Sequence, residues 1–131
     1  MISGVYAAVF ALMQVFLTLR VVKVRRSQKV SLGDGGQEEL LRKMRTHGNF
    51  VETVPMALIL MLIAELSGSP LWCLHVLGLL LLAGRICHVI GISSSTGYGK
   101  YRTYGMVMTL GVLILGATLC LWLAWPTILG A

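Results

Sequence analysis

The amino-acid sequence predicts an all-α integral membrane protein with a four-transmembrane-helix bundle. Of its 131 residues, 56% are hydrophobic and only 12% are charged, and the mean hydropathy is +0.83. A soluble domain usually carries about 25% charged residues, because a small body needs much polar material to cover its surface. The composition therefore excludes an ordinary soluble globule, a disordered tail and a secreted disulfide scaffold.

Long uncharged runs separate the charged residues. They cover 1–19, 66–84 and 103–131, with a shorter run at 53–64. A helix needs roughly 20 apolar residues to cross about 30 Å of hydrocarbon, whereas the strands of a membrane barrel are shorter and alternate in polarity. We therefore expect one domain over 1–131 in which each run belongs to one helix. The expected spans are about 1–22, 40–65, 71–92 and 104–126.

The basic residues predict how the bundle lies in the membrane. Eight of the eleven Lys and Arg residues lie between Arg20 and Arg45, and the others are Arg85, Lys100 and Arg102. With four spans, all eleven fall at one membrane face, which the positive-inside rule makes cytoplasmic. Both termini then lie on the opposite side. The net charge of +6 thus indicates orientation and not a nucleic-acid partner.

The connections between the spans carry turn residues. Gly33-Asp34-Gly35-Gly36 precedes the second span, Ser67-Gly68-Ser69-Pro70 follows it, and a loop at 93–100 leads to the fourth. Glycine, serine, aspartate and proline at these places favour tight turns. Acidic residues at 38 and 39 suit the start of the second helix, because its dipole is positive there.

The second helix carries polar residues that membrane insertion does not explain. Arg42, Arg45, Asn49 and Glu52 are spaced three, four and three residues apart, so they share one stripe of the helix. Arg42 and the neighbouring Lys43 can serve as interfacial anchors. Ionisable groups deeper in a membrane are costly and indicate function. Asn49 and Glu52 therefore belong either to a binding site or to a bond between helices.

The third and fourth helices add further polar residues at the same end. Arg85 and His88 share a face of the third helix, and an ion pair between Arg85 and Glu52 is an alternative to a ligand-binding role. Arg102 begins the fourth helix among Tyr98, Tyr101 and Tyr104. This group is either an aromatic belt with an anchoring arginine or a site where Arg102 stabilises an anion.

These residues predict a binding site for a small zwitterion rich in carboxylates. The predicted cluster comprises Arg45, Asn49, Glu52, Arg85, His88 and Arg102. Arginine binds carboxylates through two parallel hydrogen bonds, and Glu52 can accept an ammonium group. The sequence shows no metal-ligand spacing, phosphate-binding glycine loop or catalytic triad, and its three cysteines read as free thiols.

The segment from Met44 to Pro55, Met-Arg-Thr-His-Gly-Asn-Phe-Val-Glu-Thr-Val-Pro, resembles the signature of the MAPEG family. These are the membrane-associated proteins in eicosanoid and glutathione metabolism. The resemblance covers nearly the whole chain, including Gly-Arg-Ile-Cys-His-Val-Ile-Gly at 84–91, and it is greatest with the small bacterial branch. It implies a homotrimer in a bacterial inner membrane, with glutathione bound between neighbouring subunits at the cytoplasmic end.

The resemblance also implies individual roles. Arg45, Asn49 and Glu52 would hold glutathione, with Glu52 at its γ-glutamyl amine, and Arg85 and His88 would contribute from the third helix. Arg102 matches the arginine that holds the glutathione thiolate. Tyr98 or Tyr101 would assist it, and Lys23 is a weaker match to a basic residue that contacts glutathione. Two positions depart from the family pattern: Gly48 replaces an arginine of some members, and Ile92 replaces a tyrosine of the synthases.

The predicted function is that of a membrane-bound glutathione-dependent transferase, with peroxidase activity as a variant, that acts on lipophilic electrophiles in detoxification. The alternative is a non-catalytic protein of the same fold that binds lipid or protein partners. An intact Arg102 favours the enzyme, whereas Gly48 and Ile92 favour the binder. A small exporter is disfavoured because the first span lacks a carboxylate.

Overall fold

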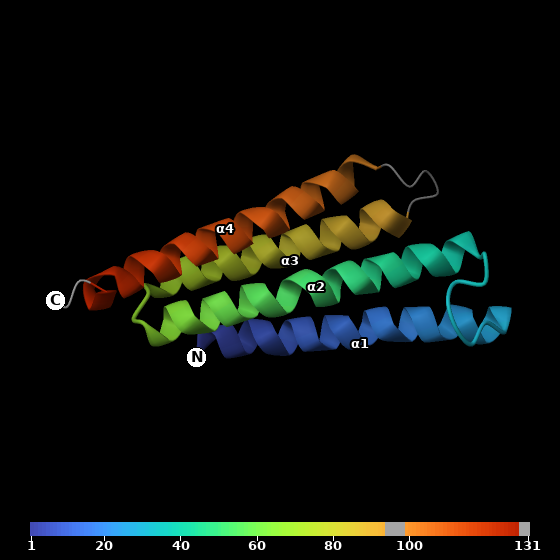
Figure 1. Cartoon of the computed structure of the whole chain (residues 1–131), viewed down its shortest axis with the longest axis horizontal. Helices are drawn as coiled ribbons and strands as arrows, with labels where there is room; N and C mark the ends of the chain where they lie inside the picture. The colour runs from blue at the N-terminus through green and yellow to red at the C-terminus, as the bar shows by residue number, and fades with distance from the viewer. Residues whose placement is uncertain (94–98, 129–131) are drawn as a thin grey trace.

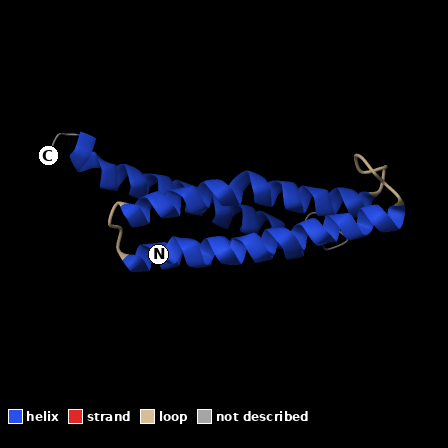
Figure 2. Ribbon diagram, turned by 90° about the horizontal axis from the view of Figure 1, so that it is seen from below, coloured by secondary structure: helices blue, strands red, loops and turns tan. Residues whose placement is uncertain are grey.

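The computed structural model describes residues 1–93 and 99–128, which form four long helices (Figure 1). Their bounds are α1 Ile2–Gln28, α2 Glu38–Leu66, α3 Leu71–Ser93 and α4 Lys100–Ile128. Within the described residues there is helix and loop but no strand (Figure 2). Each helix is long and apolar enough to cross a membrane. The predicted four-helix membrane fold is therefore confirmed.

The helices extend past their predicted spans at the end where the basic residues gather: α1 ends at Gln28 and not near 22, α4 begins at Lys100 and not near 104, and α2 begins slightly early. α1 continues to Gln28, with Arg25 and Arg26 in its last turn. α2 begins at Glu38, with Glu38 and Glu39 in its first turn. Positive charges stabilise the end of a helix and negative charges stabilise its start, because of the helix dipole. The helices therefore continue beyond the apolar runs that predict them.

Backbone conformation explains the glycine-rich connection between α1 and α2. Gly33, Gly35 and Gly36 all have positive φ, at 68°, 58° and 71°, which glycine adopts without steric cost. The Asp34 carboxylate accepts a hydrogen bond of 3.1 Å from the backbone N–H of Gly36. The predicted turn is confirmed. In the connection between α3 and α4, residues 94–98 lie outside the described part of the chain.

The core of the bundle is a set of buried apolar side chains from all four helices. Its members include Phe10 and Leu17 of α1, Phe50, Val54 and Met61 of α2, Leu77 and Leu81 of α3, and Val112 of α4. Many other large apolar side chains are exposed along the helices. Lipid tails are as apolar as leucine, so such a surface suits contact with a bilayer.

Glycines bring α3 and α4 into close contact. A Cβ atom on Gly105 would lie 2.5 Å from the carbonyl oxygen of Gly84 and 2.6 Å from the backbone nitrogen of His88. A Cβ atom on Gly91 would lie 2.2 Å from the backbone nitrogen of Arg102. The absent side chains let the two backbones touch, as is common between membrane helices. This glycine seam sets how the start of α4 lies against α3.

The ends of the four helices gather at two ends of the bundle. The end of α1, the start of α2, the end of α3 and the start of α4 meet at one end, which we call the basic end (Figure 1). The N-terminus, the turn between α2 and α3 and the end of α4 lie at the opposite end. The basic end includes Lys23, Arg45 and Arg102. These residues are far apart in the sequence, and the fold brings their helices together at this end.

Candidate functional site

A buried arginine joins α3 to α2 near the basic end. Arg85 is 1% exposed, and its Nη1 donates a hydrogen bond of 2.6 Å to Oδ1 of Asn49. A longer contact of 3.4 Å runs from the same nitrogen to Oγ1 of Thr53. The Nε and Nη2 atoms are buried and have no hydrogen-bond partner among the described residues. Arg85 and Asn49 are thus the predicted site residues that the structure brings into direct contact.

Thr53 completes this contact, although its sequence position alone did not single it out. Its hydroxyl donates to the backbone carbonyl oxygen of Asn49 at 2.8 Å, so the Thr53 oxygen acts as an acceptor toward Arg85. The Nδ2 group of Asn49 has one long contact of 3.9 Å, to the sulfur of Met106 on α4. The signal for Thr53 was present in its spacing, because it lies one helical turn after Asn49 on α2.

The alternative ion pair between Arg85 and Glu52 is not formed in the described structure, because Arg85 bonds Asn49 and Thr53 instead. Glu52 is exposed, and so is Arg45, seven residues earlier on α2. Seven residues are about two helical turns, so both side chains leave the bundle on one face of α2. Within a single chain these two charged side chains are therefore exposed, while Arg85 bonds Asn49 and Thr53.

The remaining predicted residues of α3 and α4 meet along the glycine seam. His88 is 2% exposed, and its backbone packs against Gly105. Arg102 lies in the first turn of α4, where its backbone N–H donates to the carbonyl oxygen of Gly99 at 2.9 Å. The Arg102 side chain is exposed. A helix start has unpaired N–H groups and a positive dipole end, so this position favours an anion.

Three predicted residues lie at the margin of the cluster or outside the described structure. Lys23 on α1 and Tyr101 on α4 are exposed at the basic end. Tyr98 falls within 94–98 and therefore lies outside the described residues. The two residues interpreted as anchors form ion pairs within α2. Arg42 pairs with Glu38 at 2.9 Å, and Lys43 pairs with Glu39. These pairs offset two of the positive charges at the start of α2.

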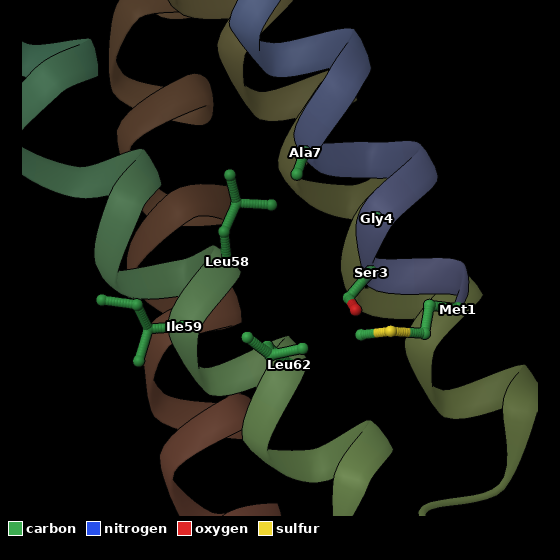
Figure 3. Close-up of a pocket in the computed structure, with 7 residues that line it drawn as sticks. All are labelled: Met1, Ser3, Gly4, Ala7, Leu58, Ile59 and Leu62. Carbon is green, nitrogen blue, oxygen red and sulfur yellow. The ribbon is translucent and has the colours of Figure 1, made fainter.

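The opposite end holds a second polar contact that the sequence did not predict. The Glu65 carboxylate of α2 accepts hydrogen bonds from the backbone N–H groups of Ile2, at 2.5 Å, and Ser3, at 2.9 Å, and from the Ser3 hydroxyl. It thereby satisfies donors at the start of α1. No side chain of the predicted cluster lines the apolar groove of about 300 Å³ that lies beside it, between α1 and α2 (Figure 3).

The described structure therefore defines a class: a four-helix integral membrane protein with a polar cluster at one end. Residues 3–122 match the MAPEG family, and the chain belongs to that family. It is 38% identical over 122 residues to the inner membrane protein YecN of Escherichia coli K12, covering 93% of this chain and 92% of that protein. The same figures hold for YecN of E. coli strain CFT073.

Proposed function

We propose that this protein is a membrane-bound glutathione-dependent transferase in which Arg102 stabilises the glutathione thiolate for attack on a lipophilic electrophile. The observation that carries the proposal is the chemistry of the basic end. Arginine and amide donors lie there together with the exposed carboxylate of Glu52, in a chain of the MAPEG family. That family is associated with glutathione.

The side chains of the basic end fit glutathione by charge and by hydrogen-bonding type. Glutathione has two carboxylates and one ammonium group. Arg45 is an exposed bidentate donor for a carboxylate, and Glu52 on the same face of α2 is an acceptor for the ammonium group. The Nδ2 group of Asn49 offers a further donor, while Lys23 and Tyr101 stand exposed at the same end.

The proposed role of Arg102 follows from thiol chemistry. Glutathione supplies the sulfur nucleophile, and a thiol is reactive as the thiolate, although its ordinary pKa is near 8.5. A guanidinium near the sulfur lowers the pKa of that thiol, because it stabilises the charged form. Arg102 supplies this charge, and the start of α4 adds a favourable dipole. The thiol proton leaves to solvent, and the thiolate forms a bond to the electrophile.

We further propose that the site is completed by assembly into a homotrimer. Arg45 and Glu52 face away from the rest of their own chain, and below them Met56 and Ile59 are exposed, at 53% and 49%. A neighbouring subunit packed on this face of α2 would cover the apolar part and approach the charged part. The proposed binding partners are then glutathione, membrane lipid, a lipophilic substrate and two further copies of the chain.

The positive-inside rule supports a cytoplasmic position for the basic end and the opposite side for both termini. The inner-membrane relative supports a bacterial inner membrane. Glutathione would then reach the site from the cytoplasm, and an apolar electrophile would reach it from the bilayer. A detoxifying conjugation fits this arrangement of a polar and an apolar substrate.

Conjugation of glutathione to a chloronitrobenzene acceptor tests the proposal. In this reaction a carbon–sulfur bond forms, a carbon–chlorine bond breaks and chloride leaves. We expect activity in the purified protein and its near-complete loss in Arg102→Ala. Lys100→Ala, which removes a neighbouring exposed cation, is the matched control and should stay within about twofold, since surface charges act weakly. Equal rates in wild type and Arg102→Ala would contradict the assignment.

Two residues favour a second function, a non-catalytic protein that binds lipid or protein partners. A Cβ atom on Gly48 would meet no described atom outside its own stretch of helix within 4 Å, and glycine offers no donor where some family members carry an arginine. Ile92, at the position of the synthases' tyrosine, is 7% exposed and offers no hydroxyl. Calorimetric titration separates the two functions. The absence of heat at millimolar glutathione would favour the binder.

A further inference from the structure

The bond between Arg85 and Asn49 fixes which way the asparagine amide points. A guanidinium has only donors, so the amide atom that lies 2.6 Å from Arg85 Nη1 must be the oxygen. The Thr53 hydroxyl, whose proton is used on the backbone carbonyl oxygen of Asn49 at 2.8 Å, meets the same guanidinium nitrogen as a second acceptor. The asparagine therefore has its acceptor turned toward α3 and its two N–H donors turned elsewhere.

Those two donors remain available for another group. Among the described residues their contact is the 3.9 Å approach to the Met106 sulfur, and a thioether is a weak acceptor. Met106 lies on α4, about one turn after Arg102. The Asn49 side chain is also incompletely buried. The amide thus carries its donors toward the helix that bears the proposed thiolate-stabilising arginine.

Arg85 is poorly explained as a residue that stabilises the fold. It is 1% exposed, and its Nε and Nη2 have no hydrogen-bond partner in the described structure. Burying polar groups without partners costs free energy, and well-packed apolar residues are often as good as buried charges or better for stability. A long apolar side chain at this position would fill the same space without the orphaned donors.

We propose that Arg85 is a positioning residue that holds the Asn49 amide with its NH2 group toward the ligand. This inference rests on the proposed function, since the ligand is taken to be glutathione. The group that meets Asn49 is then a hydrogen-bond acceptor, a carboxylate or a peptide carbonyl oxygen, and not the ammonium group. Arg85 acts on the ligand through Asn49 and has no contact with it.

Arg85→Met tests this role, because methionine keeps a long side chain and removes the bond to Asn49. We expect the glutathione dissociation constant to rise about tenfold, as for loss of one well-placed hydrogen bond. The rate constant at saturating glutathione should stay within about twofold, because Arg102 is untouched. The melting temperature should change little, because the variant loses the bond to Asn49 but also removes the buried Nε and Nη2 donors that have no partner in the described structure. Weaker binding together with a lower melting temperature would assign Arg85 a structural role and overturn the proposal.

A double-mutant cycle separates positioning from direct contact. If Arg85 acts only through Asn49, adding Arg85→Met to Asn49→Ala should weaken glutathione binding no further. A second tenfold loss in the double variant would show that Arg85 contacts the ligand and would refute the inference. Thr53→Val is the matched control, since it removes the 3.4 Å contact to Arg85 and the 2.8 Å hydrogen bond to the Asn49 backbone carbonyl oxygen but leaves the bond between Arg85 and Asn49 in place. It should change binding by less than about twofold.

Asn49→Asp keeps the inference testable if Arg85→Met fails to fold. A carboxylate retains the bond to Arg85 and strengthens it, so the variant should be at least as stable as wild type. It presents an oxygen where the NH2 group stood, so glutathione binding should weaken at least tenfold. Binding at the wild-type level would overturn the proposal.

Nuclear magnetic resonance separates failure of this inference from failure of the proposed function. In the ligand-free protein, the Asn49 side-chain NH2 signals should be sharp in wild type and should broaden or shift in Arg85→Met. Unchanged signals would overturn the inference even if glutathione binds. A wild-type protein that shows the expected signals but binds no glutathione would sink the proposed function and leave the Arg85–Asn49 positioning intact.

Discussion

Substitution of Gly105 by alanine would test whether the glycine seam positions the candidate site. The added Cβ atom would lie 2.5 Å from the carbonyl oxygen of Gly84 and 2.8 Å from the Cβ atom of His88. Ordinary contacts of a Cβ atom begin near 3.4 Å, so α3 and α4 must separate locally by about 0.9 Å. The nearest atoms belong to the backbone, which cannot rotate away as a flexible side chain can.

Gly111 on the same helix provides the matched control. Apart from its own stretch of helix, no described atom lies within 4 Å of its would-be Cβ position, so Gly111→Ala should gain up to about 1 kcal/mol from helix propensity alone. Gly105→Ala has the same propensity gain, but overpacking of a close contact costs about 1–3 kcal/mol. We therefore expect Gly105→Ala to unfold at least about 1 kcal/mol more easily than Gly111→Ala.

The assay is reversible unfolding of detergent-solubilised protein in denaturant, followed by circular dichroism. Because the seam carries Arg102 and His88, Gly105→Ala should also lower the proposed conjugation rate, whereas Gly111→Ala should not. Equal free energies of unfolding for the two variants would refute the reasoning. That result would mean that α3 and α4 are not in backbone contact at Gly105.

Two further predictions concern the end opposite the site. Glu65→Ala removes the acceptor for Ile2 and Ser3 and should lower the free energy of unfolding by about 1–2 kcal/mol, as for loss of a helix cap. In the same denaturant assay Glu52→Ala, an exposed carboxylate, should change it by less than about 0.5 kcal/mol. Tyr6→Phe keeps the ring in place and removes the 3.2 Å hydrogen bond to His75, so it should cost about 1 kcal/mol. A Tyr6→Phe protein as stable as wild type would argue against that bond.

The sequence was sufficient to predict the fold, because a bilayer excludes charged residues and the uncharged runs between them therefore mark the membrane spans. Four uncharged runs gave four helices, and the glycines at 33, 35 and 36 gave a turn with positive φ. The helix ends were less predictable. α1 runs on into polar residues and α4 begins among them, where hydropathy no longer marks the helix and only caps and dipoles do.

The candidate site could be predicted as a set of residues but not as a set of contacts. Spacing placed Asn49 and Glu52 on one stripe of α2, yet it could not tell which of them meets Arg85. The partner of Arg85 depends on how α3 is rotated against α2. In the structure Arg85 donates a hydrogen bond to Asn49. Glu65 was missed for a related reason. Its partners at Ile2 and Ser3 are more than 60 residues away in the chain, and only folding brings them together.

The most direct test of the central claim is the ultraviolet absorbance of the glutathione thiolate on mixing with the purified protein at neutral pH. Wild type should convert bound glutathione to thiolate, because the Arg102 guanidinium lowers the pKa of the thiol. Arg102→Ala should bind glutathione without raising the thiolate signal, since Arg45, Asn49 and Glu52 remain. Equal thiolate signals in the two proteins, or no binding by wild type at millimolar glutathione, would contradict the account.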